Sequence, residues 1–99
     1  MDQIRPISRE ELPHISLGTA PMLGDEARIA RWKDLHRAAF IGNLREEKVT
    51  FFLQGGGKEV LQMETTLWAC TQEWAVFKEG QRIPVESILR VAFHQASEE

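Results

Sequence analysis

Cys70 is the single cysteine of the chain and its one candidate thiol nucleophile. A nucleophilic cysteine needs a neighbouring base or cation that lowers its pKa, and no histidine lies near Cys70 in the sequence. One cysteine also forms no disulfide within a chain, which is typical of a protein in a reducing compartment. We therefore expect a packing role for Cys70.

The three histidines, His14, His36 and His94, are the other candidate metal ligands. A structural zinc site needs about four ligands at a recognisable spacing, and these residues lie far apart along the chain. His36 falls on the apolar side of a predicted helix, where we expect its ring nitrogen to bond a carbonyl. The sequence therefore predicts neither a metal site nor a cofactor.

Adjacent carboxylates occur twice, at Glu10-Glu11 and Glu46-Glu47. Adjacent side chains diverge on a helix or a strand, so these pairs do not indicate a dyad that shares a proton. Gly55-Gly56-Gly57 lacks the lysine and Ser/Thr of a phosphate loop and joins two predicted strands, which favours a hairpin turn. Because no nucleophile, base and orienting group belong together, we expect no enzymatic activity and name no catalytic residue.

A basic segment spans residues 28–48, with six bases against three acids, so 6 − 3 gives a local charge of +3 in a chain of net charge −3. Such a face can hold a phosphate backbone, which makes four residues candidates for nucleic-acid binding: Arg28, Arg31, Lys33 and Arg37. The solvated face of an ordinary surface helix has the same composition. Both interpretations stay open.

Trp68 and Trp74 flank a predicted turn, and Trp68 falls on the more polar face of its strand. An exposed tryptophan in such a place favours binding of a protein partner, since tryptophan is enriched at interaction hot spots. The alternative is that both rings cover one end of the β-rich half or pack under the helix. We take both as candidate partner-binding residues.

The elements that position these residues differ between the two halves of the chain. In the first half, Ser8 and Glu11 form a capping box, with Ile7 and Leu12 in the staple positions, and Pro13 limits the helix to about one turn. A longer helix is predicted from Ala20 to Ile41, with Thr19 as its N-cap.

Gly42-Asn43 is predicted to end this helix. Its apolar residues recur at three- and four-residue spacing and should dock it on the rest of the domain: Ile29, Trp32, Leu35, His36, Ala39 and Phe40.

Alternating apolar residues in the second half predict five strands, over 49–53, 59–71, 74–77, 82–85 and 88–93. The second is long enough that we expect it to bend or carry a bulge. Residues 95–99 are expected to be frayed.

Length and composition fit one domain over residues 1–99, with a helical part over 1–44 and a β-rich part over 48–93. The pI near 5.6 argues against a surface that binds polyanions as a whole. No segment has the apolar length of a membrane span or a secretory leader, so we expect no membrane association and a cytoplasmic location.

The strand pattern resembles the bacterial Sm-like and SH3-like small barrels. The likeness covers about half of the chain and runs through Val49-Thr50-Phe51-Phe52-Leu53, Trp74-Ala75-Val76-Phe77-Lys78 and Ile83-Pro84-Val85-Glu86-Ser87-Ile88. The resemblance implies an α+β, mainly β fold, in which an N-terminal helical segment packs on a five-stranded antiparallel small barrel.

In the Sm-like RNA chaperones a basic residue and a histidine before the fifth strand help to hold RNA. Here that place reads Pro84-Val85-Glu86, so the family's RNA site transfers to no residue of this chain. We therefore predict a protein-interaction module that binds a protein partner or a second copy of itself. The alternative hypothesis is an Sm-like nucleic-acid-binding regulator that uses the basic helix face.

Overall fold

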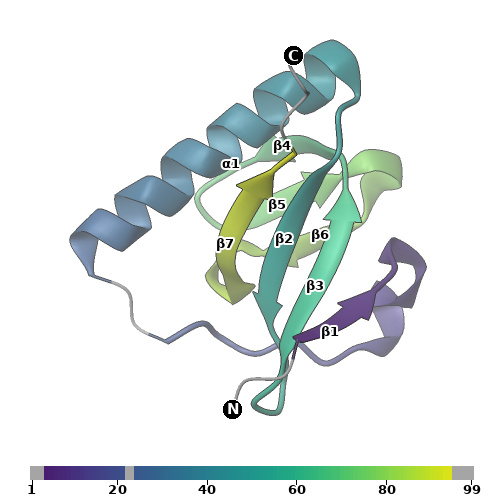
Figure 1. Ribbon diagram of the computed structural model, residues 1–99, viewed down its shortest axis with the longest axis vertical. Helices are drawn as coiled ribbons and strands as arrows, with labels where there is room; N and C mark the ends of the chain where they lie inside the picture. Colours follow the sequence, from purple (N-terminus) through teal and green to yellow (C-terminus); the bar gives the residue numbers. More distant parts are fainter. Residues whose placement is uncertain (1–3, 22–23, 95–99) are drawn as a thin grey trace.

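The computed structural model describes residues 4–21 and 24–94, so the predicted frayed tail at 95–99 lies outside the described residues. In chain order the elements are β1 (Ile4–Ile7), η1 (Arg9–His14), α1 (Asp25–Arg45), β2 (Val49–Gln54), β3 (Val60–Thr65), β4 (Leu67–Cys70), β5 (Trp74–Phe77), η2 (Lys78–Gly80), β6 (Arg82–Pro84), η3 (Val85–Ser87) and β7 (Ile88–Phe93) (Figure 1).

The strands form two sheets. One sheet has the order β1-β3-β2-β7, and the other has the order β4-β5-β6. β1 runs parallel to β3, whereas the remaining pairs are antiparallel. The helix α1 lies along one side of this arrangement, against β4 and β7 (Figure 1). No helix among the described residues has the length and apolar character needed to cross a membrane.

The predicted five-stranded antiparallel barrel is wrong. Within residues 4–21 and 24–94 the strands belong to a four-stranded mixed sheet and a three-stranded sheet that do not close into a barrel. The chain changes sheets at Thr66 and again at η3, and strand pairing stops at both places. The helical segment is not N-terminal to all strands either, because α1 follows β1.

The strand β1 was not predicted. Its partner β3 is more than fifty residues away in sequence, with Ile4 opposite Val60 and Ile7 opposite Met63. Pro6 within it weakens any local strand signal, since proline lacks the N–H that a ladder needs. The short turn after it is confirmed: η1 begins with a capping box in which the Glu11 carboxylate accepts hydrogen bonds from the Ser8 backbone N–H and hydroxyl, at 3.0 and 3.2 Å.

The helix α1 begins five residues and ends four residues later than predicted. Gly24 is its N-cap, and Glu46 takes the left-handed conformation at its C-terminus, with φ 53°. Thr19 belongs instead to an extended segment beside the β2–β3 turn, where the Gly18 N–H donates to the Gln54 carbonyl at 2.9 Å. Gly42 was predicted to end the helix but lies buried inside it.

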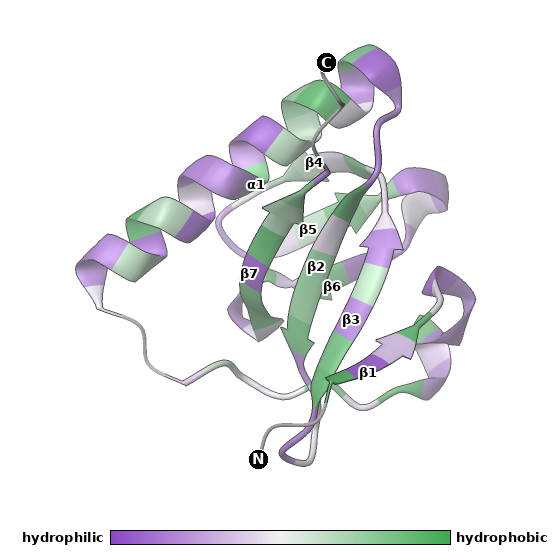
Figure 2. Cartoon of the chain, viewed as in Figure 1, coloured by the Kyte–Doolittle hydropathy of each residue, from purple (hydrophilic) through white to green (hydrophobic). Residues whose placement is uncertain are grey.

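The predicted bend in the long second strand is confirmed, because this stretch divides into β3 and β4 and passes from one sheet to the other. The core lies between the sheets and under α1. The rings of Phe51 on β2 and Phe77 on β5 meet edge to face, 5.0 Å apart, and join the two sheets. Hydrophobic residues cover much of β2, while α1 alternates between hydrophobic and hydrophilic turns (Figure 2).

Candidate functional site

The inner face of α1 is made of Leu35, Ala38 and Gly42, which are buried at intervals of three and four residues. Two of these residues are small, so the helix comes very close to β4. A Cβ placed on Gly42 would overlap the Leu67 carbonyl oxygen. This close approach fixes which side of the helix faces solvent.

The opposite side carries large apolar residues that the fold leaves uncovered. We define the outer stripe as Ile29, Trp32, His36, Phe40 and Leu44, all exposed and all on one side of α1 at about 100° per residue. Phe40 and Leu44 are 66% and 65% exposed. The predicted docking stripe is therefore wrong in part: Leu35 and Ala39 turn toward the domain, whereas Ile29 and Phe40 do not, and Trp32, 36% exposed, lies at the boundary between the two sides.

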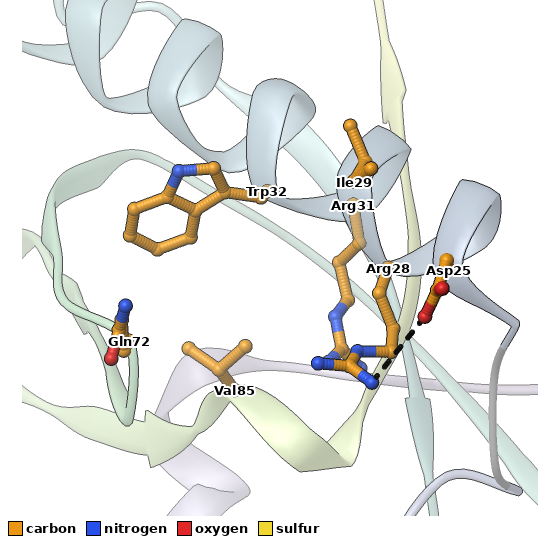
Figure 3. Close-up of a pocket in the computed structure, with 7 residues that line it drawn as sticks. All are labelled: Asp25, Arg28, Ile29, Arg31, Trp32, Gln72 and Val85. Atoms are coloured by element: carbon orange, nitrogen blue, oxygen red, sulfur yellow. Dashed lines mark ion pairs between the residues drawn. The ribbon is translucent and has the colours of Figure 1, made fainter.

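Two hollows lie along this side. The first, of about 590 Å³, lies between the start of α1 and the segments around Gln72 and Val85. The Trp32 ring forms one wall of this hollow, and the guanidinium groups of Arg28 and Arg31 form the opposite wall (Figure 3). The second, of about 340 Å³, lies on the C-terminal half of the helix and is lined by His36, Ala39, Phe40, Asn43 and Leu44.

Trp32 lines the first hollow, and its neighbour His36 lines the second. Its indole meets the His36 imidazole edge to face, with ring centroids 4.1 Å apart and an angle of 83° between the planes. Such a contact restrains the indole and lowers the entropy that it would lose on binding a partner. The aromatic pair at the centre of the outer stripe is therefore restrained before any partner binds.

Trp68 extends the apolar surface onto β4. The pairing of β4 with β5 shifts register between Leu67 and Ala69, and Trp68 is the extra residue of this irregularity. A bulge of this kind re-aims a side chain, and Trp68 is 42% exposed. Its carbonyl accepts a hydrogen bond from the Asn43 side-chain amide of α1, at 2.6 Å.

Trp74, the other candidate partner-binding tryptophan, is half-buried on β5. The Arg82 guanidinium stacks over its ring at 4.5 Å. Since its π-face already holds a cation of the same chain, Trp74 offers less free surface than Trp68. The structure therefore separates the two candidates.

The four candidate nucleic-acid-binding bases do not share one face of α1. Lys33 and Arg37 lie on one flank of the outer stripe, and Arg28 and Arg31 lie on the other. Arg28 lies 3.9 Å from the Asp25 carboxylate. The Arg37 guanidinium lies 4.2 Å from the centre of the Phe93 ring.

Arg31 already bonds to another element of its own chain. Its guanidinium donates a hydrogen bond to the Ile88 carbonyl at 3.1 Å. Burial and then the like charge of Arg28 lower the pKa of Arg31, while Glu86 opposes that shift. Three of the four bases thus already contact groups of this chain.

The remaining chemical candidates are dispersed. Cys70 is half-buried, and burial raises the pKa of its thiol. The His94 ring contacts the Thr50 hydroxyl at 2.8 Å and the Glu64 carboxylate at 3.4 Å. Within the described ranges, no three His, Cys, Asp or Glu side chains are grouped as metal ligands.

The adjacent carboxylates make separate contacts. Glu11 belongs to the capping box, Glu46 pairs with Lys78 at 3.2 Å, and Glu47 lies 4.0 Å from Arg45. These contacts stabilise turns and helix ends. They bring neither pair together around a common proton.

Sequence reasoning missed Leu44, because the helix was predicted to end at Ile41, and it placed Ile29 and Phe40 on the wrong side. In the sequence, the inner face is marked by two small residues, Ala38 and Gly42, which follow Leu35 at intervals of three and four residues. Hydropathy alone gives such residues little weight.

Comparisons of the chain with protein-family models, with curated proteins and with solved structures found no match. The function has therefore to be inferred from the surface chemistry of this chain.

Proposed function

We propose that this protein is an interaction module that binds an apolar surface of another polypeptide along the outer stripe of α1 and Trp68. One observation carries the proposal. Six large hydrophobic residues are exposed in the described part of the chain, and five of them lie on α1 or on the strand packed against it: Ile29, Trp32, Phe40, Leu44 and Trp68.

These side chains expose several hundred Å² of apolar surface in total, which is at the upper end of what a monomer usually shows. Such surface is worth about 25 cal/mol per Å² when a partner removes it from water. Tryptophan is also enriched at binding hot spots, and phenylalanine is enriched in the cores of interfaces. The area and the composition both support a protein partner.

The sheet edges at β1 and β4 are poorer docking sites. The edge strand β1 carries Arg5 and Pro6, and charge and proline both discourage the addition of a strand. The edge of β4 lies against α1, and the Trp68 carbonyl already accepts a hydrogen bond from Asn43. We therefore assign partner binding to side chains of α1 and not to strand addition at β1 or β4.

Nucleic-acid binding has less support. Its four candidate bases lie on two flanks of the helix, and three of them contact groups of this chain. A phosphate backbone would have to displace those contacts before it gained new ones.

Photo-crosslinking tests the proposal. A photoreactive phenylalanine analogue is placed at Phe40, with a matched control at Lys58, which is exposed on the β2–β3 turn. We expect cells to yield polypeptide adducts from position 40 that disappear with Ile29→Glu and are absent from position 58. Equal yields from both positions, or none from position 40, would overturn the proposed function.

A further inference from the structure

We infer that the outer stripe pairs with the outer stripe of a second copy of this chain, with the two α1 helices antiparallel about a two-fold axis at His36. This inference rests on the proposed function, because it names the polypeptide that the surface binds. It adds a partner, an orientation and a register, each of which can be measured separately.

The spacing of the outer stripe is nearly the same in both directions from His36. Trp32 lies four residues before it and Phe40 four residues after it. Ile29 lies seven residues before it and Leu44 eight residues after it. A two-fold axis therefore sets an aromatic ring against an aromatic ring and an aliphatic chain against an aliphatic chain. Isologous dimers need this kind of self-complementary surface.

The second hollow has the shape that this register requires. His36, Ala39, Phe40 and Asn43 occupy positions i, i+3, i+4 and i+7, which form the hole of a knobs-into-holes contact. The axis at His36 brings Trp32 of the second copy over the centre of that hole. Ala39 supplies the small side chain that leaves room for a large knob.

The same operation reaches the rim of the first hollow. Phe40 of the second copy comes to lie against Trp32, whose ring forms one wall of that cavity (Figure 3). The contact therefore extends from the second hollow of one copy toward the first hollow of the other.

The length of the contact sets the expected affinity. A helix of 21 residues is about 31 Å long. Pairing along it would bury on the order of 500 Å² per copy, or about 1,000 Å² in total, which is at the lower limit of specific interfaces. We expect a reversible dimer with a Kd of about 10–100 µM.

Charges beside the stripe tune this affinity. Antiparallel helices align their macrodipoles favourably, but the acidic first turn, with Asp25 and Glu26, approaches a helix end where Arg45 is followed by Glu46 and Glu47, so the side chains there add no net attraction. Lys33 comes to the flank of the second copy that bears Arg37, and these like charges weaken the pair. Lys33→Glu should therefore tighten the dimer about fivefold, since two opposite-charge pairs replace two like-charge pairs.

Sedimentation equilibrium of the full chain from about 1 to 300 µM tests the pairing. We expect a monomer–dimer equilibrium, weakened at least tenfold by Phe40→Glu and tightened by Lys33→Glu. Ile4→Glu is the matched control, because Ile4 is as exposed as Ile29 but lies on β1. It should leave the dimer unchanged. A monomer over the whole range would overturn the inference.

Disulfide crosslinking in a Cys70→Ala background tests orientation and register. His36→Cys should crosslink to itself, because it lies on the axis. Ile29→Cys should crosslink with Leu44→Cys and not with itself, since two copies of position 29 would be about 21 Å apart along the helices. A self-crosslink at position 29 would indicate parallel pairing and overturn the proposed register.

The two proposals fail in different ways. If the chain is monomeric and the photo-crosslink from position 40 joins it to a different polypeptide, the pairing with a second copy is wrong and the interaction module stands. If position 40 gives no adduct and the chain is monomeric, both are wrong. An adduct of twice the 11.3 kDa mass of the chain supports both.

Discussion

Asn43 holds Trp68 to the helix: its side-chain amide donates one hydrogen bond to the Trp68 carbonyl at 2.6 Å and another to the Ala39 carbonyl of its own helix at 2.8 Å. The contact ties the apolar residue on β4 to the outer stripe of α1. One amide thus links the two elements that form the proposed docking surface.

Replacing this amide should loosen the contact. Asn43→Ala removes both hydrogen bonds, and we expect the free energy of unfolding to fall by about 1 kcal/mol, the usual net value for an exposed polar contact of this kind. Urea denaturation measures the change. If Asn43→Ala unfolds at the same urea concentration as the wild type, the amide does not join the helix to β4.

Gly42 should tolerate no side chain. Alanine normally favours a helix by up to about 1 kcal/mol over glycine, but here its Cβ would overlap the Leu67 carbonyl oxygen. We expect Gly42→Ala to destabilise the protein by about 1–3 kcal/mol through overpacking. The sign of the change is the test, because at a helix position with free space alanine would stabilise the protein. An unchanged or increased stability of Gly42→Ala would contradict the close approach of α1 to β4.

The edge-to-face contact between Phe51 and Phe77 should contribute strongly to the free energy of unfolding. Phe51 is fully buried against Phe77, so Phe51→Ala should cost about 3–5 kcal/mol. Its neighbour Phe52 is half-buried under the Arg90 guanidinium, 4.0 Å from the ring centre, and Phe52→Ala should cost about 1 kcal/mol. Chemical denaturation of both variants checks the order, and a reversed order would contradict the placement of the core.

Cys70 should make the protein less stable in alkali. Because burial raises the pKa of the folded thiol above its ordinary value of 9.0, the unfolded chain loses its proton first as the pH rises. Stability is therefore unaffected by this group at neutral pH and falls once the pH passes the unfolded pKa. We expect Cys70→Ala to remove that part of the decline.

Urea denaturation at several values between about pH 7 and pH 10.5 compares the two proteins. Other titrating groups are common to both and cancel in the difference. A difference that does not change with pH would show that Cys70 has the same pKa folded and unfolded.

The strands could be predicted because their signal is local. β2, β5 and β7 are found within a residue of the expected bounds, since apolar alternation and the turns between strands set them. A bend or bulge within residues 59–71 was also expected from strand length, and the structure places it at Thr66. The sequence pattern could not predict which strands pair with each other. β1 pairs with β3, which is more than fifty residues away, and the two sheets do not close into the predicted barrel.

The candidate surface was only partly predictable. The polar strand face of Trp68 left an exposed ring and a packed ring both open, and in the structure the residue is 42% exposed. Part of the outer stripe was mistaken for the docking face because Ile29, Trp32 and Phe40 are large apolar residues at helical spacing. The helix in fact packs through Leu35, Ala38 and Gly42, where small size permits close contact and matters more than hydrophobicity.

The indole N–H signals of the three tryptophans, followed by nitrogen–proton correlation NMR from about 500 to 10 µM protein, test the central claim most directly. Trp32 lies in the proposed contact, whereas Trp74 lies under Arg82 on β5. We expect the Trp32 signal to move with concentration and the Trp74 signal to stay in place. A fixed Trp32 signal, or one that moves no more than that of Trp74, would contradict pairing through the outer stripe.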